Sequence, residues 1–205
     1  MLSTSPNITI NDWVVFDLET TGLSPHADSI IQIAAVRMRG GRVMAGEVFS
    51  SFVDPMRPIP AWITQYTGIR NSDVKGAPPA GRALVEFSRF VGQSTLVAHN
   101  GHRFDMKFLA SGCHKEQLMT RPVTYHDSLG LSWEVWGRRG LRHGLDAVLS
   151  RLELMDPAIR RHDARGDVEL LARAIETMCD RLRNDGRSEA LGALRRYEGC
   201  LPQVP

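Results

Sequence analysis

A short apolar segment near the N-terminus, WVVFDLETTGL, most constrains what this chain can fold into. Residues Trp13 to Leu18 are almost continuously apolar, and a Thr-Thr-Gly turn follows them. Such a run is typical of a strand that is buried on both faces in the centre of a sheet. Asp17 and Glu19 interrupt the pattern, and a carboxylate in such a place is costly unless a cation meets it. The segment therefore predicts a central strand that also contributes to a cation site.

The rest of the pattern predicts an α/β fold, a mixed five-stranded sheet flanked by helices. Strands at residues 29–38 and 43–53 would complete an antiparallel meander, and short buried strands are expected at 95–98 and 123–125. Helices are expected at residues 61–67, 81–91, 103–111, 128–135, 144–152 and 165–182. The length of 205 residues suits a single domain, expected over residues 1–205 with a core at about 13–182.

The charge and the cysteine content by themselves exclude few classes of function. The 25 basic and 23 acidic residues leave a formal charge of +2, too small to indicate nucleic-acid binding alone. Three unevenly spaced cysteines without a CxxC pair predict neither a disulfide framework nor a zinc ribbon, so a cytoplasmic location is expected. We expect no membrane association, because no stretch approaches the roughly 18 apolar residues of a membrane span.

Two further acids lie where an expected helix should be apolar. Asp105 shares a helical face with Phe108 and Leu109. Asp167 begins a stripe that Leu170, Leu171, Ala174 and Met178 continue, and core faces rarely hold an unpaired Asp.

Each acid also has a local alternative explanation. The first pair could cap the turn that follows it, Asp105 could favour a helix dipole, and Asp167 could pair with a buried arginine. If all four converge, they would repel one another unless cations neutralise them, and hard oxygen ligands favour Mg²⁺ or Mn²⁺. Two such ions can activate a water in phosphoryl displacement. His162, expected on the loop before Asp167, could act as general base, or could be an ordinary surface histidine.

Five segments occur in a telling order: FDLETTGL, DSIIQIAAV, TGI, LVAHNGHRFD and HDARGD. Together, over about residues 13 to 175, they resemble the DnaQ-like 3′→5′ exonucleases of the DEDD group, in the histidine subtype. The resemblance implies a ribonuclease-H-like fold. It also implies two divalent cations, Mg²⁺ or Mn²⁺, held by Asp17, Glu19, Asp105 and Asp167, with His162 as the base.

The resemblance further implies contacts to the terminal nucleotide of a substrate, with Leu23 wedged against its base and Tyr66 stacked on a base. The full set would be Thr20, Leu23, Tyr66, His99, Asn100 and Phe104. Ordinary core packing remains the alternative for Leu23, Tyr66 and Phe104. Four arginines could meet backbone phosphates or could form a solvated basic surface: Arg103, Arg138, Arg139 and Arg142.

Two departures from the family pattern stand out. Gln32 occupies a position where many relatives have Glu, and we expect it to support the site without disabling it. The segment HNGHRFD is one residue longer than the common HNAxFD form, and it is similar to the corresponding segment of the three-prime repair exonucleases. Residues 187–205 show no convincing clamp- or polymerase-binding motif.

The implied function is metal-dependent 3′→5′ hydrolysis of nucleic-acid ends, releasing nucleoside 5′-monophosphates. The favoured substrate is DNA, above all single-stranded DNA. The expected role is proofreading or repair, and association with a polymerase is a possible partner interaction. A 3′→5′ exoribonuclease is the close alternative, because few contacts decide whether a 2′-hydroxyl is accepted. A third hypothesis is a catalytically idle module that binds nucleic acid or associates with a polymerase. An aspartyl phosphotransferase is a fourth, and would need a lysine beside Asp17.

Overall fold

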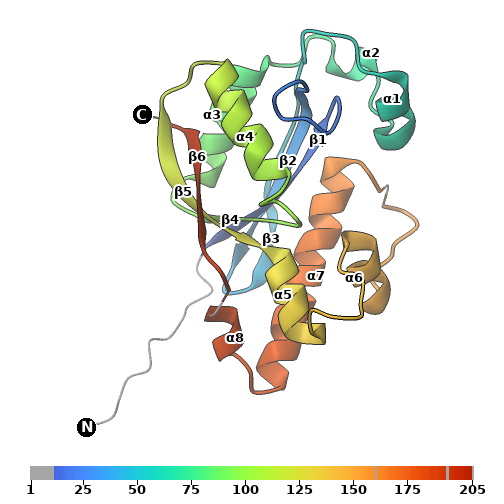
Figure 1. Cartoon of the computed structure of the whole chain (residues 1–205), viewed down its shortest axis with the longest axis vertical. Coiled ribbons are helices and arrows are strands. Elements are labelled where there is room, and N and C mark those ends of the chain that lie inside the picture. The colour runs from blue at the N-terminus through green and yellow to red at the C-terminus, as the bar shows by residue number, and fades with distance from the viewer. Residues whose placement is uncertain (1–11, 160, 193, 205) are drawn as a thin grey trace.

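The computed structural model describes residues 12–159, 161–192 and 194–204. Its centre is a mixed six-stranded sheet in the order β3-β2-β1-β4-β5-β6 (Figure 1). The strands are β1 (Trp13–Thr20), β2 (Ile30–Arg39), β3 (Arg42–Phe52), β4 (Thr95–Ala98), β5 (Thr120–Asp127) and β6 (Tyr197–Pro202). The first three form the predicted antiparallel meander, whereas β4 runs parallel to both β1 and β5.

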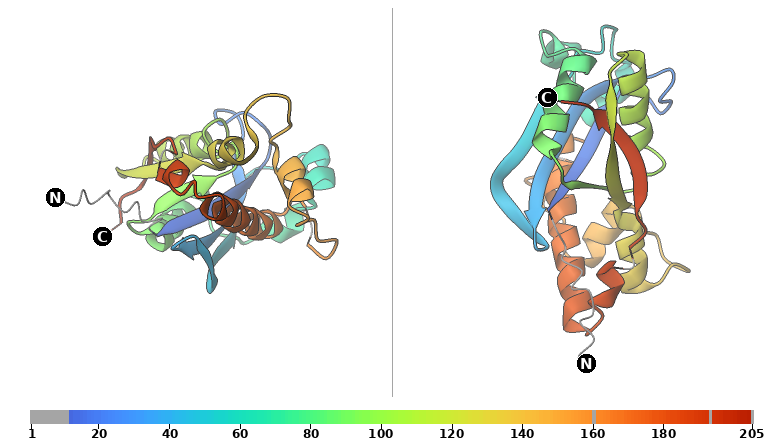
Figure 2. Two further views of the ribbon diagram at one scale, coloured as in Figure 1. Left: turned by 90° about the horizontal axis from the view of Figure 1, so that it is seen from below. Right: turned by 90° about the vertical axis from the view of Figure 1, so that its left-hand side faces the viewer.

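Helices cover both faces of this sheet, as Figure 2 shows from two further directions. They are α1 (Ala61–Thr67), α2 (Asn71–Val74), α3 (Ala80–Val91), α4 (Asp105–Lys115), α5 (Ser128–Trp136), α6 (Leu145–Arg151), α7 (Ala164–Asn184) and α8 (Glu189–Gly192). Helices α3 and α4 pack on one face, and α5, α6 and α7 pack on the other. No helix in the described part of the chain is both long and apolar enough to cross a bilayer.

Strand β1 is buried on both faces, as its sequence predicts. Its even-numbered apolar residues, Val14, Phe16 and Leu18, join the core under α3 and α4. Trp13 and Val15 join the core under α7. Because side chains alternate along a strand, Asp17 and Glu19 continue the α7-facing set beyond the point where apolar packing ends.

The prediction of five strands is wrong, because β6 forms a sixth, antiparallel to β5. Its sequence, YEGCLP, contains Glu, Gly and Pro, which are depleted in strands, so only pairing with β5 specifies it. A Cβ at Gly199 would lie 2.4 Å from Cε of Met106, so a larger residue there would require the end of the Met106 side chain to move. The short helices α2 and α8 were also not predicted.

Candidate active site

One cleft at the C-terminal end of β1, about 250 Å³ in volume, is lined by every site residue that the sequence predicts. They are Asp17, Glu19, Thr20, Leu23, Tyr66, His99, Asn100, Phe104, Asp105, His162 and Asp167. These residues come from β1 and its following turn, α1, the loop after β4, the start of α4 and the start of α7. Residues up to 150 positions apart therefore meet at one edge of the sheet.

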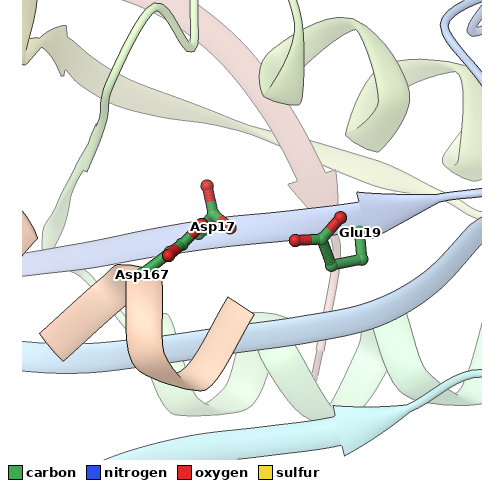
Figure 3. A group of neighbouring side chains, drawn as sticks. All are labelled: Asp17, Glu19 and Asp167. Carbon is green, nitrogen blue, oxygen red and sulfur yellow. The ribbon is translucent and has the colours of Figure 1, made fainter. Parts of the chain in front are cut away.

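Three of the four acids form a tight cluster. Asp17, Glu19 and Asp167 each place a carboxylate oxygen within 4.8 Å of the others. Figure 3 shows Asp167 reaching from α7 toward Asp17 on β1, with Glu19 farther along the same strand. Asp105, the first residue of α4, is 3% exposed and lines the same cleft outside this cluster. The alternative in which Asp17 and Glu19 cap the next turn is not supported, because Asp28 accepts that turn's Ser24 amide and no hydrogen bond joins the turn to either acid among the described residues.

Burial and mutual repulsion raise the pKa values of these carboxyls. Burial raises the pKa of Glu19 to about 8, and the charges of Asp105 and Asp163 add to the effect. Burial is also the main cause of a pKa of about 7 at Asp105. The pKa of Asp17 lies well above its ordinary value, first through burial and then through Asp105 and Glu19. Such a group of acids is suited to a cation that would offset their charge.

Asp105 gives a second indication that a cation fits. Its Oδ1 is buried and has no hydrogen-bond partner among the described residues. A buried carboxylate oxygen without a donor is unusual, because leaving it unsatisfied destabilises the folded state. Oxygen donors of this kind match the ligand preference of Mg²⁺ and Mn²⁺.

The arginine alternative for Asp167 is also present in the structure. The guanidinium of Arg161 forms an ion pair with Asp167, and its Nη2 lies 2.7 Å from Oδ1 of Asp146. Arg161 thereby supplies the cluster with a protein cation, and its charge lowers the pKa of both Asp17 and Glu19. Arg161 was not among the site residues predicted from the sequence.

His162 lies on the turn before α7, as predicted, and its backbone adopts a left-handed φ of 60°. Its ring stacks on Tyr66 with centroids 4.0 Å apart, so it is not an ordinary surface histidine. Its backbone N–H donates to both carboxylate oxygens of Asp167, at 3.3 and 3.2 Å. Burial, followed by the charge of Arg161, lowers the pKa of His162. A neutral imidazole in this place can accept a proton.

Gln32 holds the start of α7 against the sheet. It pairs with Glu19 across β1 and β2 and is 1% exposed. Its Nε2 donates to Oδ1 of Asp163 at 3.1 Å, and its Oε1 accepts the Ala164 amide at 2.9 Å. Asp163 in turn caps α7 by accepting the amide of Arg165. Gln32 thus supports the site as the sequence predicts, because it lies beside Glu19 and holds the residues that begin α7.

Replacing Gln32 with leucine is expected to lower the free energy of unfolding by about 2–3 kcal/mol, because the buried Ala164 N–H loses its acceptor. Urea denaturation measures this change. The matched control is Gln93→Leu, at an exposed position, with an effect within about 0.5 kcal/mol. Equal effects of the two substitutions would show that the Gln32 hydrogen bonds contribute nothing to stability.

The apolar residues of the cleft differ in how they are packed. Leu23 is 76% exposed and Tyr66 56%, so ordinary core packing does not explain either residue. Phe104 is half-buried and packs on Phe108 with ring centroids 4.8 Å apart, so core packing does apply to it. Trp62, 53% exposed and one helical turn before Tyr66, also lines the cleft and was missed. The four-residue spacing of Trp62 and Tyr66 in WITQY, which places both on one face of a helix, was the available signal.

The remaining predicted contacts are largely engaged by the protein itself. His99 is hydrogen-bonded at Nδ1 to Ser128 Oγ and at Nε2 to the carbonyl of His143, both at 2.8 Å. The Thr20 hydroxyl donates to the carbonyl of Gly22. The backbone N–H of Asn100 donates to Oδ1 of Asp127, and Asn100 lines the cleft. His99 and Thr20 therefore fix the shape of the cleft wall.

With this geometry in place, the chain can be compared with known proteins. The family model described as "Exonuclease" matches residues 14–175. The chain belongs to the exonuclease family. This is the family that the motifs predicted. None of the chain's three lysines lines the cleft, which removes the support for an aspartyl phosphotransferase.

Two named relatives agree with this assignment. The chain is 42% identical over 179 residues to a DNA polymerase III subunit epsilon-like protein of Rhodobacter capsulatus, covering 85% of this chain and 24% of that protein. It is 40% identical over 160 residues to a PolC-type DNA polymerase III of Latilactobacillus sakei, covering 77% of this chain and 10% of that protein. The chain thus spans a quarter or less of these relatives.

The fold matches the nuclease domain of 3′hExo, described as a DEDDh family member bound to rAMP. The TM-score is 0.75 at 19% identity, over 95% of this chain and 100% of that one. This likeness confirms the predicted α/β, ribonuclease-H-like fold.

Proposed function

We propose that this chain is a metal-dependent 3′→5′ exonuclease that releases nucleoside 5′-monophosphates from DNA, with single-stranded 3′ ends preferred. The single observation that carries the proposal is a cluster of three carboxylates within 4.8 Å of one another, in a cleft that also exposes Leu23, Trp62 and Tyr66. The acids suit metal-assisted hydrolysis, and the exposed apolar side chains suit stacking on a base. A role in proofreading or repair belongs to the same proposal.

Asp17, Glu19, Asp105 and Asp167 would hold two divalent cations, Mg²⁺ or Mn²⁺. When bound, such ions lower the pKa of water and stabilise charge on phosphoryl oxygens. The side chains of the protein would position the 3′ end of the nucleic-acid strand. Tyr66 and Trp62 would stack on bases, Leu23 would wedge beside the terminal base, and His99, Asn100, Phe104 and Thr20 would form the wall behind it.

In this proposal His162 removes the proton from the attacking water. Replacing His162 with alanine is expected to lower kcat by a factor of about 10²–10⁴, the usual contribution of a general base, while KM changes little. Steady-state kinetics on a labelled oligonucleotide measures both quantities. His114→Ala, an exposed histidine of α4, is the control with unchanged kcat. A kcat for His162→Ala within threefold of the unchanged protein would remove His162 from the mechanism.

The direct test incubates the protein with Mg²⁺ or Mn²⁺ and 5′-labelled oligonucleotides. The expected result is a ladder shortened from the 3′ end, with nucleoside 5′-monophosphates as products. Matched DNA and RNA strands in the same assay separate the deoxyribonuclease from the exoribonuclease alternative. Tight binding of the strands without shortening in either metal would instead support the idle nucleic-acid-binding module.

Two further parts of the proposal rest on the relatives. Because those relatives are named as subunits or types of DNA polymerase III, we infer association with a replicative polymerase. We also propose that residues 1–205 act as one exonuclease domain. Copurification of a tagged chain with polymerase, compared with a tag alone, tests the association.

A further inference from the structure

A second cleft, about 500 Å³ in volume, adjoins the candidate active site, because Asn100 lines both. It lies between the loop after β4, helix α5 and the segment leading into β6. Three arginines line it: Arg103, Arg138 and Arg195. All three are exposed, and no ion pair joins any of them to an acid among the described residues.

The two acids that line this second cleft are already engaged. Glu134 forms an ion pair with Arg187 at 3.2 Å. Asp127 accepts backbone amides of Asn100, His102 and Leu129 and so caps α5. The three guanidiniums therefore leave a net positive charge on the walls of the cleft.

Planar side chains alternate with these cations. The guanidinium of Arg138 lies over the ring of Trp133, 4.6 Å from its centroid, and that of Arg195 lies over Tyr197 at 4.8 Å. On the same wall, exposed His102 stacks on Tyr197 at 4.3 Å and is fixed by a 2.7 Å hydrogen bond to the hydroxyl of Tyr125. Guanidiniums held against rings are pre-oriented, so less side-chain freedom is lost when they bind a ligand.

From these contacts we propose that the second cleft binds the single strand upstream of the 3′ end, with arginine–phosphate contacts and base stacking on its planar wall. This inference rests on the proposed exonuclease function and adds a second contact region to it. Positive charge beside planar side chains, of which His102 is the exposed one here, is the pattern that binds single-stranded nucleic acid without sequence preference. Sharing Asn100 with the acidic cleft gives a strand a continuous path from one cleft to the other.

The test compares a long and a minimal substrate. The long one is a ten-residue oligothymidylate, and the minimal one is the p-nitrophenyl ester of thymidine 5′-monophosphate, which is too short to reach the second cleft. In the double variant Arg138→Ala/Arg195→Ala, the ratio of kcat/KM for the long substrate to that for the minimal one is expected to fall at least tenfold. The slope of log kcat/KM for the long substrate against log salt should become shallower by about 1.4, which corresponds to two phosphate contacts.

Arg82→Ala is the matched control, because Arg82 is an exposed arginine of α3 that lines neither cleft, and it should leave ratio and slope unchanged. A ratio and slope in the double variant equal to those of the control would overturn the inference while leaving the proposed function intact. If the unchanged protein hydrolyses neither substrate in Mg²⁺ or Mn²⁺, the proposed function fails and the inference fails with it. Circular dichroism melts of each variant establish that the fold is retained.

Discussion

Replacing Asp17 with asparagine is expected to lower kcat/KM on a labelled DNA strand by at least about 10³-fold, equivalent to roughly 4 kcal/mol of transition-state stabilisation. The two side chains are nearly identical in shape, so packing under α7 should persist. What changes is the charge: Asp17 lies within 4.8 Å of Glu19 and Asp167, and a neutral amide oxygen is a weaker ligand of a divalent ion than a carboxylate.

Two measurements accompany this prediction. Calorimetric titration with Mn²⁺ should show weaker binding to Asp17→Asn, independently of any hydrolysis. Asp185→Asn, an exposed acid just after α7, gives the matched change far from the cleft and should alter neither quantity. Activity within tenfold of the unchanged protein would mean that Asp17 holds no essential ion.

The metal-free protein is expected to lose stability as pH rises from about 4.5 to 8. Glu19 has a pKa of about 8 in the folded state and an ordinary value of 4.5, so the folded state binds the extra proton. A raised pKa stabilises the folded state below the unfolded value and ceases to do so as pH passes the folded value. For Glu19 alone this loss is on the order of 4 kcal/mol, and Asp105 acts in the same direction up to about pH 7.

Denaturation in EDTA across this pH interval measures the loss. Glu19→Gln should flatten the curve and make the metal-free protein more stable than the unchanged one at pH 8, while activity disappears. Added Mn²⁺ should restore stability to the unchanged protein, and more so at pH 8 than at pH 5.5, because binding requires the deprotonated ligands. A flat pH curve for the unchanged protein in EDTA would contradict the burial of these charges.

Much of the fold was accessible from the sequence because its signals are local. The continuous apolar run of β1, the stripe of α7 and the Gly40-Gly41 turn each specify one element without help from the rest of the chain. Strand β6 has no such signal. It is specified by its pairing with the edge of β5, and that pairing belongs to the tertiary structure.

The residues of the candidate site likewise fall into those with a sequence signal and those without one. The acids and His162 were found because charge interrupts an apolar period and because the motifs follow one another in a known order. Arg161 was missed, since a single arginine beside a histidine has no periodic signature and its partners, Asp146 and Asp167, lie on different helices. The engagement of both His99 ring nitrogens was likewise invisible, because Ser128 and His143 approach only after folding.

The pairing of β6 with β5 also bears on how the chain can be divided. The region shared with the family ends at residue 175, before Met178, Cys179 and Leu182 complete the buried side of α7. A chain cut at that point would lose those contacts, the last strand, and Tyr197 with the ring stack it makes with Tyr125 and His102. The segment that the family model matches is therefore shorter than the segment whose contacts build the sheet and the buried side of α7.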